Sequence, residues 1–174
     1  MTTLVRYRAD NFSIRPAVPA DVPLILSLIR GLAEYERLVD ECIATEEQLE
    51  KWIFQEKKAE VVIGEAGGDP VGFALFFTSF STFLSKPGIY LEDLFIIPKA
   101  RGNGYGKQLL RHLARLVVER GYGRLEWACL DWNKPSIAFY LSLGAVRMDE
   151  WTTYRLTGEA LEHLARIRRS SPGA

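Results

Sequence analysis

The chain has 174 residues, of which 48% are hydrophobic and 25% charged, a balance typical of a globular protein. Its 22 basic and 22 acidic side chains cancel, which argues against a nucleic-acid binder that works by neutralising phosphates. No apolar run approaches the roughly 20 residues of a membrane helix, and the start lacks the apolar core of a signal peptide. The two cysteines form no CxxC pair, and with two scattered histidines they predict no metal site. We therefore expect a cytoplasmic protein that binds neither nucleic acid nor membranes.

Hydrophobic spacing and turn signals predict a mixed α/β layer fold in a single domain over residues 12–167. The ends, residues 1–11 and 168–174, are expected to be loosely ordered. The order is strand-helix-helix-strand-strand-strand-helix-strand-helix-strand-helix. In chain order we expect strand 12–17, a helix capped by Asp21, a helix capped by Thr45, strands 60–66, 71–80 and 89–97, helix 107–120, strand 125–130, a helix from its cap Asn133 to Gly144, strand 151–156 and a helix capped by Thr157.

The most informative motif is the run Arg101-Gly102-Asn103-Gly104-Tyr105-Gly106-Lys107 between a predicted strand and a predicted helix. Glycines let a backbone approach a ligand, and the unpaired N–H groups of a helix start bind phosphate or pyrophosphate. The spacing excludes a Walker A loop, because position 101 is Arg and Gln108 follows Lys107. It also differs from a dinucleotide fingerprint, whose third glycine comes one residue later. The pattern that remains is Arg-x-x-Gly-x-Gly; its alternative interpretation is a glycine-rich turn without a ligand.

Tyr140 is a candidate general acid. It lies seven residues, or two helical turns, after Asn133, so both side chains share one face of a helix. A phenol with a pKa near ~10 is protonated at neutral pH and could return a proton to a leaving group. The alternative is a core aromatic packed beside Ile137 and Leu141.

Glu92 and Asp93 are neighbouring acids on the predicted strand before the glycine turn. Neighbouring strand residues point to opposite faces, so the two carboxylates form no pair unless a bulge intervenes. A carboxylate in this apolar strand is costly to bury without a partner. Glu92 could bind an ammonium group or accept its proton through water. For each acid the alternative is a structural ion pair or a hydrogen bond at the strand end.

Several segments together resemble one enzyme family. They are Leu32–Glu36, Tyr90–Phe95, Arg101–Gly106, Asp131–Tyr140 and Leu143–Ala145. In this order they are similar to the diamine (spermidine/spermine) and thialysine acetyltransferase branch of the GNAT N-acetyltransferase superfamily. The resemblance covers roughly residues 12–167. It implies an acetyl-CoA-dependent N-acetyltransferase that acts on a small-molecule amine as a homodimer.

The resemblance also implies a role for particular residues. Acetyl-CoA would be bound by Leu94, Phe95, Ile96, Arg101, Gly102, Asn103, Gly104, Tyr105, Gly106, Lys107, Asn133 and Ser136. The amine would be bound by Tyr35, Glu36, Glu92, Asp93, Glu150 and Trp151, and catalysis would rest on Tyr140 and Glu92. The chain is shorter between Ala145 and Trp151 than the animal enzymes, which leaves polyamine selectivity open.

Three functions follow from these residues. The first is direct transfer of acetyl from acetyl-CoA to a primary amine of a small polyamine or diamine-like substrate. The second is acetylation of another small amine, such as thialysine or a lysine analogue. The third is an acetyl-CoA sensor without turnover, which Glu92 and Tyr140 disfavour because a sensor needs only to bind the cofactor.

Overall fold

The computed structural model describes residues 11–166, and these divide into two compact units, of which the first ends at Ala128 and the second begins at Cys129. The first unit contains a five-stranded sheet with the strands in sequence order. The strands are β1 (Phe12–Pro16), β2 (Glu60–Ala66), β3 (Asp69–Ser81), β4 (Lys86–Ile96) and β5 (Leu125–Trp127). Strands β1 to β4 pair antiparallel, whereas β5 pairs parallel to β4. The mixed α/β fold predicted from the sequence is confirmed.

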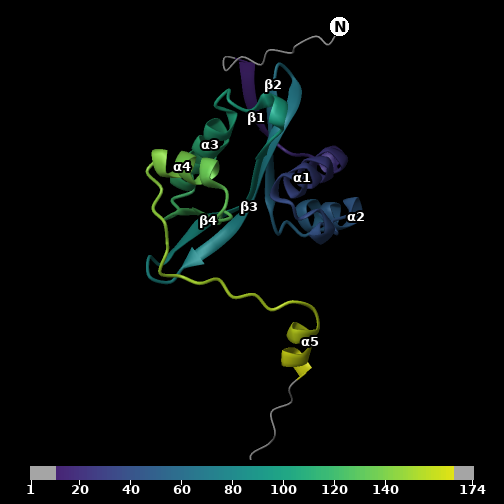
Figure 1. The fold of residues 1–174 in the computed structure, drawn as a ribbon, viewed down its shortest axis with the longest axis vertical. Helices are drawn as coiled ribbons and strands as arrows, with labels where there is room; N and C mark the ends of the chain where they lie inside the picture. Colours follow the sequence, from purple (N-terminus) through teal and green to yellow (C-terminus); the bar gives the residue numbers. More distant parts are fainter. Residues whose placement is uncertain (1–10, 167–174) are drawn as a thin grey trace, which may run out of the picture. The chain divides into compact units, whose positions relative to one another are not determined.

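Helices cover both faces of this sheet. On one face lie α1 (Val22–Glu36) and α2 (Glu46–Leu49), and on the other lies α3 (Tyr105–Glu119) (Figure 1). Helix α2 begins as predicted, since Thr45 Oγ1 accepts a hydrogen bond from the Gln48 N–H at 3.3 Å, and it continues as a π-helical turn over Glu50–Gln55. The core between α1 and the sheet includes Ile25, Leu28, Ile53, Ile63, Phe73 and Phe95.

Two details of the first unit differ from the prediction. Asp21 lies at the start of α1 but its carboxylate does not cap the helix, because it accepts from Arg15 at 2.6 and 2.9 Å and from the Val18 N–H at 2.8 Å. Strand β5 ends at Trp127, three residues before the predicted limit, because its pairing with β4 stops at Leu91.

The second unit contains two helices, α4 (Lys134–Ser142) and α5 (Gly158–Arg166). Asn133 caps α4, with its Oδ1 accepting from the Ser136 N–H at 3.3 Å, and Gly144 follows the helix end with a φ of +85°. Both signals were predicted from the sequence.

The predicted strand over residues 151–156 is wrong for this structure. The segment has no regular secondary structure and pairs with no strand among residues 11–166. Trp151, Tyr154 and Leu156 are 73%, 90% and 51% exposed. A strand gains its hydrogen bonds from a neighbouring strand, so an alternating sequence without such a partner stays irregular. Of the predicted loose ends, residues 1–10 and 168–174 lie outside the described residues, and Asn11 accepts a hydrogen bond from the Gly67 N–H at 2.9 Å.

Candidate functional site

The glycine turn, Arg101–Lys107, leads directly into α3. Gly102 and Gly104 have φ angles of +80° and +79°, a region that L side chains rarely adopt. Gly104 is the N-cap of α3, and no side chain caps the helix. A Cβ added at either glycine would meet no atom within 4 Å, so the space in front of the turn is open. The turn therefore offers the helix's first N–H groups and its positive dipole end to an anion.

Side chains from the turn also hold its shape. The Arg101 Nε donates to the Ile96 carbonyl at 2.9 Å, and the Asn103 Nδ2 donates to the carbonyls of Ala100 and Arg101 at 3.0 and 3.2 Å. Tyr105 is only 1% exposed, and its ring stacks on that of Phe12 with centroids 4.4 Å apart. The side chain of Tyr105 is thus a core residue, and only its backbone faces the turn.

Strand β4 changes its pairing in the middle. Leu91 pairs with Phe76 and Asp93 with Leu75, so Glu92 is an extra residue that forms a β-bulge. On the other side, β5 pairs with β4 no further than Leu91. Beyond the bulge, β4 therefore has an edge toward β5 that no strand of the described chain covers. Leu94, Phe95 and Ile96 lie on this segment, and such an edge offers backbone groups for hydrogen bonds to another molecule.

The bulge also places the two neighbouring acids beside a third. Burial, together with the nearby charges of Glu92 and Glu36, raises the pKa of Asp93 to about 7. Burial likewise raises the pKa of Glu36. Glu92 itself is exposed. We call Glu36, Glu92 and Asp93 the acidic cluster. Because one member titrates near neutral pH, the cluster can either attract a cation or exchange a proton.

The side chain of Arg101 in the glycine turn contacts α1 and β4, the two elements that carry the acidic cluster. The Cζ of Arg101 lies 4.3 Å from the centroid of the Tyr35 ring and 5.4 Å from that of Phe95. Tyr35 precedes Glu36 in the last turn of α1, and Phe95 follows the bulge on β4. The structure thus brings together most of the predicted residues of the first unit.

The remaining predicted residues belong to the second unit. Asn133 is buried, and Ser136 and Tyr140 are half-buried. The Tyr140 ring is tilted by 49° against that of Phe139, with ring centroids 5.4 Å apart. Asn133 and Tyr140 begin and nearly end the same short helix, as predicted. Glu150 and Trp151 are exposed in the irregular segment.

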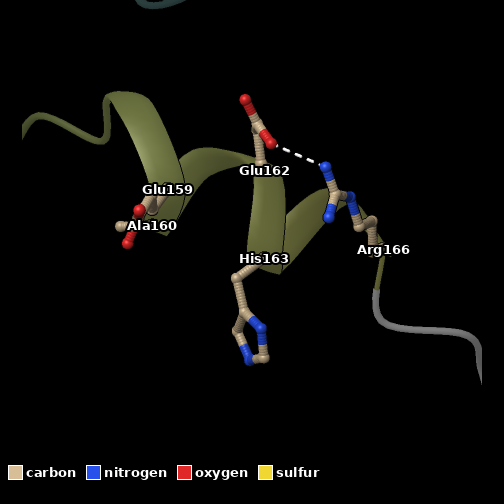
Figure 2. Close-up of a pocket in the computed structure, with 5 residues that line it drawn as sticks. All are labelled: Glu159, Ala160, Glu162, His163 and Arg166. Atoms are coloured by element: carbon tan, nitrogen blue, oxygen red, sulfur yellow. Dashed lines mark hydrogen bonds and ion pairs between the residues drawn. The ribbon is translucent and has the colours of Figure 1, made fainter.

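A surface hollow beside α5 carries none of the predicted residues. It is lined by Glu159, Ala160, Glu162, His163 and Arg166 (Figure 2). Arg166 donates to Glu162 at 2.6 Å, and all five side chains are exposed on one helix. Since no second element encloses the hollow, it lacks the convergent walls of a ligand site.

Sequence reasoning did not find the contact between Arg101 and Tyr35, or the burial of Tyr105. No local signal marks the first, because the two residues are 66 positions apart. The spacing of Tyr105 from Leu109 and Leu113 places it on the buried stripe of α3, so helical periodicity could have revealed the second. Within residues 11–166, no three histidine, cysteine, aspartate or glutamate side chains gather as metal ligands, and no helix has the length and hydropathy to cross a membrane.

An uncapped helix start after a glycine turn is suited to an anion, and the acidic cluster on the bulged strand is suited to a cation. The model of the acetyltransferase (GNAT) family matches residues 28–145, which include parts of both units. The chain therefore belongs to this family and is an acetyltransferase.

Relatives place it more closely. It is 38% identical over 166 residues to the thialysine N-epsilon-acetyltransferase of Bos taurus, covering 87% of this chain and 96% of that protein. It is 32% identical over 200 residues to L-ornithine N5-acetyltransferase NATA1 of Arabidopsis thaliana, covering 88% of each. It is 29% identical to spermidine/spermine N(1)-acetyltransferase-like protein 1 of Homo sapiens, covering 90% of this chain and 24% of that protein. Among solved structures, an integron cassette protein from the mobile metagenome of V. cholerae is similar, with a TM-score of 0.76 and 26% identity over 90% of this chain and 98% of that one.

Proposed function

We propose that the protein transfers acetyl from acetyl-CoA to a primary amine of a small polyamine or diamine-like molecule. The observation that carries this proposal is the junction of the open glycine turn with the acidic cluster at the end of β4. The turn suits the pyrophosphate of the cofactor because Gly102 and Gly104 leave space that a Cβ would fill. The acidic cluster suits an ammonium group because its charges attract a cation.

The open edge of β4 supports a place for the rest of the cofactor. Backbone groups of Leu94, Phe95 and Ile96 would bind the pantetheine portion, and an N–H there would stabilise the oxyanion that develops on the acetyl group. Asn133 and Ser136 are proposed to line the cofactor as well. The side-chain Oδ1 of Asn133 caps α4, so a contact of this side chain with the cofactor would be made through its Nδ2 group.

The reaction is proposed to be direct attack. The amine reaches the site as an ammonium ion, and Glu92 accepts its proton directly or through water. The nitrogen lone pair then forms a bond to the acetyl carbon, and the carbon–sulfur bond breaks. Tyr140 donates its phenolic proton to the departing thiolate of CoA. Tyr35, Glu36, Asp93, Glu150 and Trp151 would bind the amine.

The relatives favour a second candidate of the same reaction class. Two of them act, by their names, on thialysine and on L-ornithine, which are amino acids with a side-chain amine. An acetyltransferase for thialysine or another lysine analogue would use the same glycine turn and acidic cluster. It would need an additional contact for the substrate carboxylate, which polyamines lack.

One experiment separates these functions. The protein is mixed with acetyl-CoA and, in turn, spermidine, thialysine, L-ornithine and L-lysine, and release of the CoA thiol is measured. A specificity constant highest for spermidine supports the first candidate, and one highest for thialysine or ornithine supports the second. Binding of acetyl-CoA without thiol release for any amine would contradict both and leave the sensor.

We also propose a homodimer. The irregular segment 145–157 carries Val146, Met148, Trp151 and Tyr154, which are exposed by 62% or more. A second copy of the chain would bury these apolar side chains. Sedimentation at micromolar concentration should give the mass of two chains, and a fully active monomer would contradict the proposal. Neither Cys42 nor Cys129 forms a disulfide within residues 11–166, which supports a reducing, cytoplasmic location. The family match across both units supports one acetyltransferase domain over residues 12–167.

A further inference from the structure

The side chain of Arg101 ties the glycine turn to the end of β4 by a hydrogen bond. Its Nε donates to the carbonyl of Ile96, the last residue of β4, at 2.9 Å. Asn103 holds the carbonyl of the same arginine from the other side, with its Nδ2 at 3.2 Å. The side chain and the backbone of Arg101 are thus both fixed before the turn reaches the N-cap Gly104.

The guanidinium is placed by rings from two elements. Its Cζ lies 4.3 Å from the centre of the Tyr35 ring and 5.4 Å from that of Phe95. An arginine can donate from Nε and stack its plane on an aromatic ring at once, which a lysine cannot do. Among residues 11–166 the two Nη groups of Arg101 have no hydrogen-bond partner, so the contacts that fix the group are the Nε bond and the rings.

Helix α1 is held where Tyr35 can reach the arginine. Gly31, one turn before Tyr35, lies against the Phe95 ring so closely that an added Cβ would be 3.1 Å from Cε1. Tyr35 itself packs against the core cluster that contains Phe95. The last turn of α1 is therefore seated on the end of β4. The next residue, Glu36, belongs to the acidic cluster, so α1 contacts both halves of the site.

We propose that Tyr35 and Arg101 form a stacked pair of positioning residues that holds the glycine turn in the shape that binds acetyl-CoA. This inference rests on the proposed function, and it gives Tyr35 a role that differs from amine binding. A residue on the helix that carries Glu36 then controls the affinity for the cofactor. The same stack explains why an arginine at position 101 is more than a positive charge near phosphate.

The test measures two constants: the KM for acetyl-CoA at saturating amine, and the Kd of CoA by calorimetry. Tyr35→Leu removes the ring and should raise both constants by about three- to tenfold, whereas Tyr35→Phe keeps the ring and should stay within about twofold. Arg101→Lys keeps the charge but loses the stack and the Nε bond, and should match Tyr35→Leu. The double variant Tyr35→Leu/Arg101→Lys should be no worse than the poorer single variant, because both changes break one unit.

Lys107→Gln is the matched control. Lys107 is exposed in the same turn, and it carries a positive charge but no guanidinium plane to stack on a ring. Its loss should weaken cofactor binding through charge alone, so its effect should multiply with that of Tyr35→Leu.

Three results would overturn the inference: wild-type cofactor constants in folded Tyr35→Leu, near wild-type constants in Arg101→Lys, or independent effects of these two changes. Arg101 is exposed, so its variant tests the pair even if Tyr35→Leu does not fold. Failure of the wild-type protein to acetylate any amine would instead contradict the proposed function. In that case the calorimetric CoA affinities would still decide whether the pair positions the turn.

Discussion

The glycine turn and two members of the acidic cluster, Glu92 and Asp93, lie at the two ends of one short stretch of chain, yet the two regions differ in how they hold charge. The turn keeps Arg101 and Lys107 exposed and leaves open space before Gly104. In the acidic cluster, by contrast, Asp93 is half-buried beside two other acids, and its pKa is raised to about 7. Phosphate groups stay charged at neutral pH, so a fixed cationic surface is enough to bind them. An amine must lose a proton to react, so a carboxyl that can exchange a proton near neutral pH is useful beside it.

The largest effect is expected where neither region acts. Tyr140→Phe removes the hydroxyl that we propose to protonate the departing thiolate and retains the ring. Turnover should fall by roughly ten- to ten-thousand-fold, while acetyl-CoA affinity changes little, because one neutral hydrogen bond is worth about 1 kcal/mol. Single-turnover kinetics would measure the chemical step directly.

Tyr122→Phe is the matched control for this change. Tyr122 follows the end of α3 that is farther from the glycine turn, and the Cζ of Arg120 lies 6.0 Å from the centroid of its ring. Tyr122→Phe removes the same hydroxyl oxygen from a ring outside the proposed site. Wild-type turnover in Tyr140→Phe, with chemistry limiting the rate, would leave Tyr140 as a packing residue.

A change in the glycine turn should weaken cofactor binding strongly and leave the acidic cluster intact. Gly104→Val puts a branched side chain into the space before α3 and should weaken acetyl-CoA binding about 100-fold through lost charge-assisted hydrogen bonds. Gly121→Val, at the far end of α3, also has a positive φ and open surroundings, with φ +68° against +79°. Calorimetry on both variants separates the ligand effect from backbone strain, and equal affinities would argue against the turn as the cofactor site.

Asp93 predicts a dependence of stability on pH. Its pKa is about 7 in the folded protein, above the ordinary value of 3.8, so the unfolded chain releases this proton first. The contribution of Asp93 to stability is therefore present below about pH 4, falls as the pH rises to about 7, and is constant above that. Asp93→Asn removes this titration. Relative to that of the wild type, its free energy of unfolding should therefore rise by about 1 to 3 kcal/mol as the pH increases from 4 to 8.

Urea unfolding at both pH values would measure this difference. Glu36→Gln should shift the Asp93 titration to lower pH without removing it, because one nearby negative charge is lost. Parallel stability curves for wild type and Asp93→Asn would mean that the carboxyl is ordinary.

The smallest effect should come from Glu92, the exposed member of the acidic cluster. Glu92→Gln keeps the shape and should lower kcat/KM for the amine about tenfold, with acetyl-CoA affinity nearly intact. It should also lower the pKa of Asp93, because the Glu92 charge helps to raise it. Glu119→Gln removes an exposed charge at the far end of α3 and serves as the control. Unchanged amine kinetics in Glu92→Gln would assign that carboxylate to the structure alone.

Local signals in the sequence predicted much of this fold. The caps Thr45 and Asn133 and the glycine before α3 act within a few residues of themselves, so a short stretch of sequence determines them. The prediction of a strand at 151–156 was wrong because a strand needs a pairing partner, which the local sequence does not determine. The bulge at Glu92 and the Arg101–Tyr35 stack depend on pairing and packing between distant segments. The acids were therefore recognised as candidates, but their raised pKa values required the folded structure.

The stacked rings of Phe12 and Tyr105 bear on how the chain folds. Phe12 is the first residue of β1, and Tyr105 is the first residue of α3, so the contact closes a loop of more than ninety positions. Among residues 11–166, β1 pairs with β2 alone, and β2 begins at Glu60, so this pairing needs a segment that comes much later in the chain. Contacts between such distant residues slow folding because the chain loses entropy before it gains them. We therefore expect the start of α3 to be completed late in folding, when β1 joins strands that have already paired.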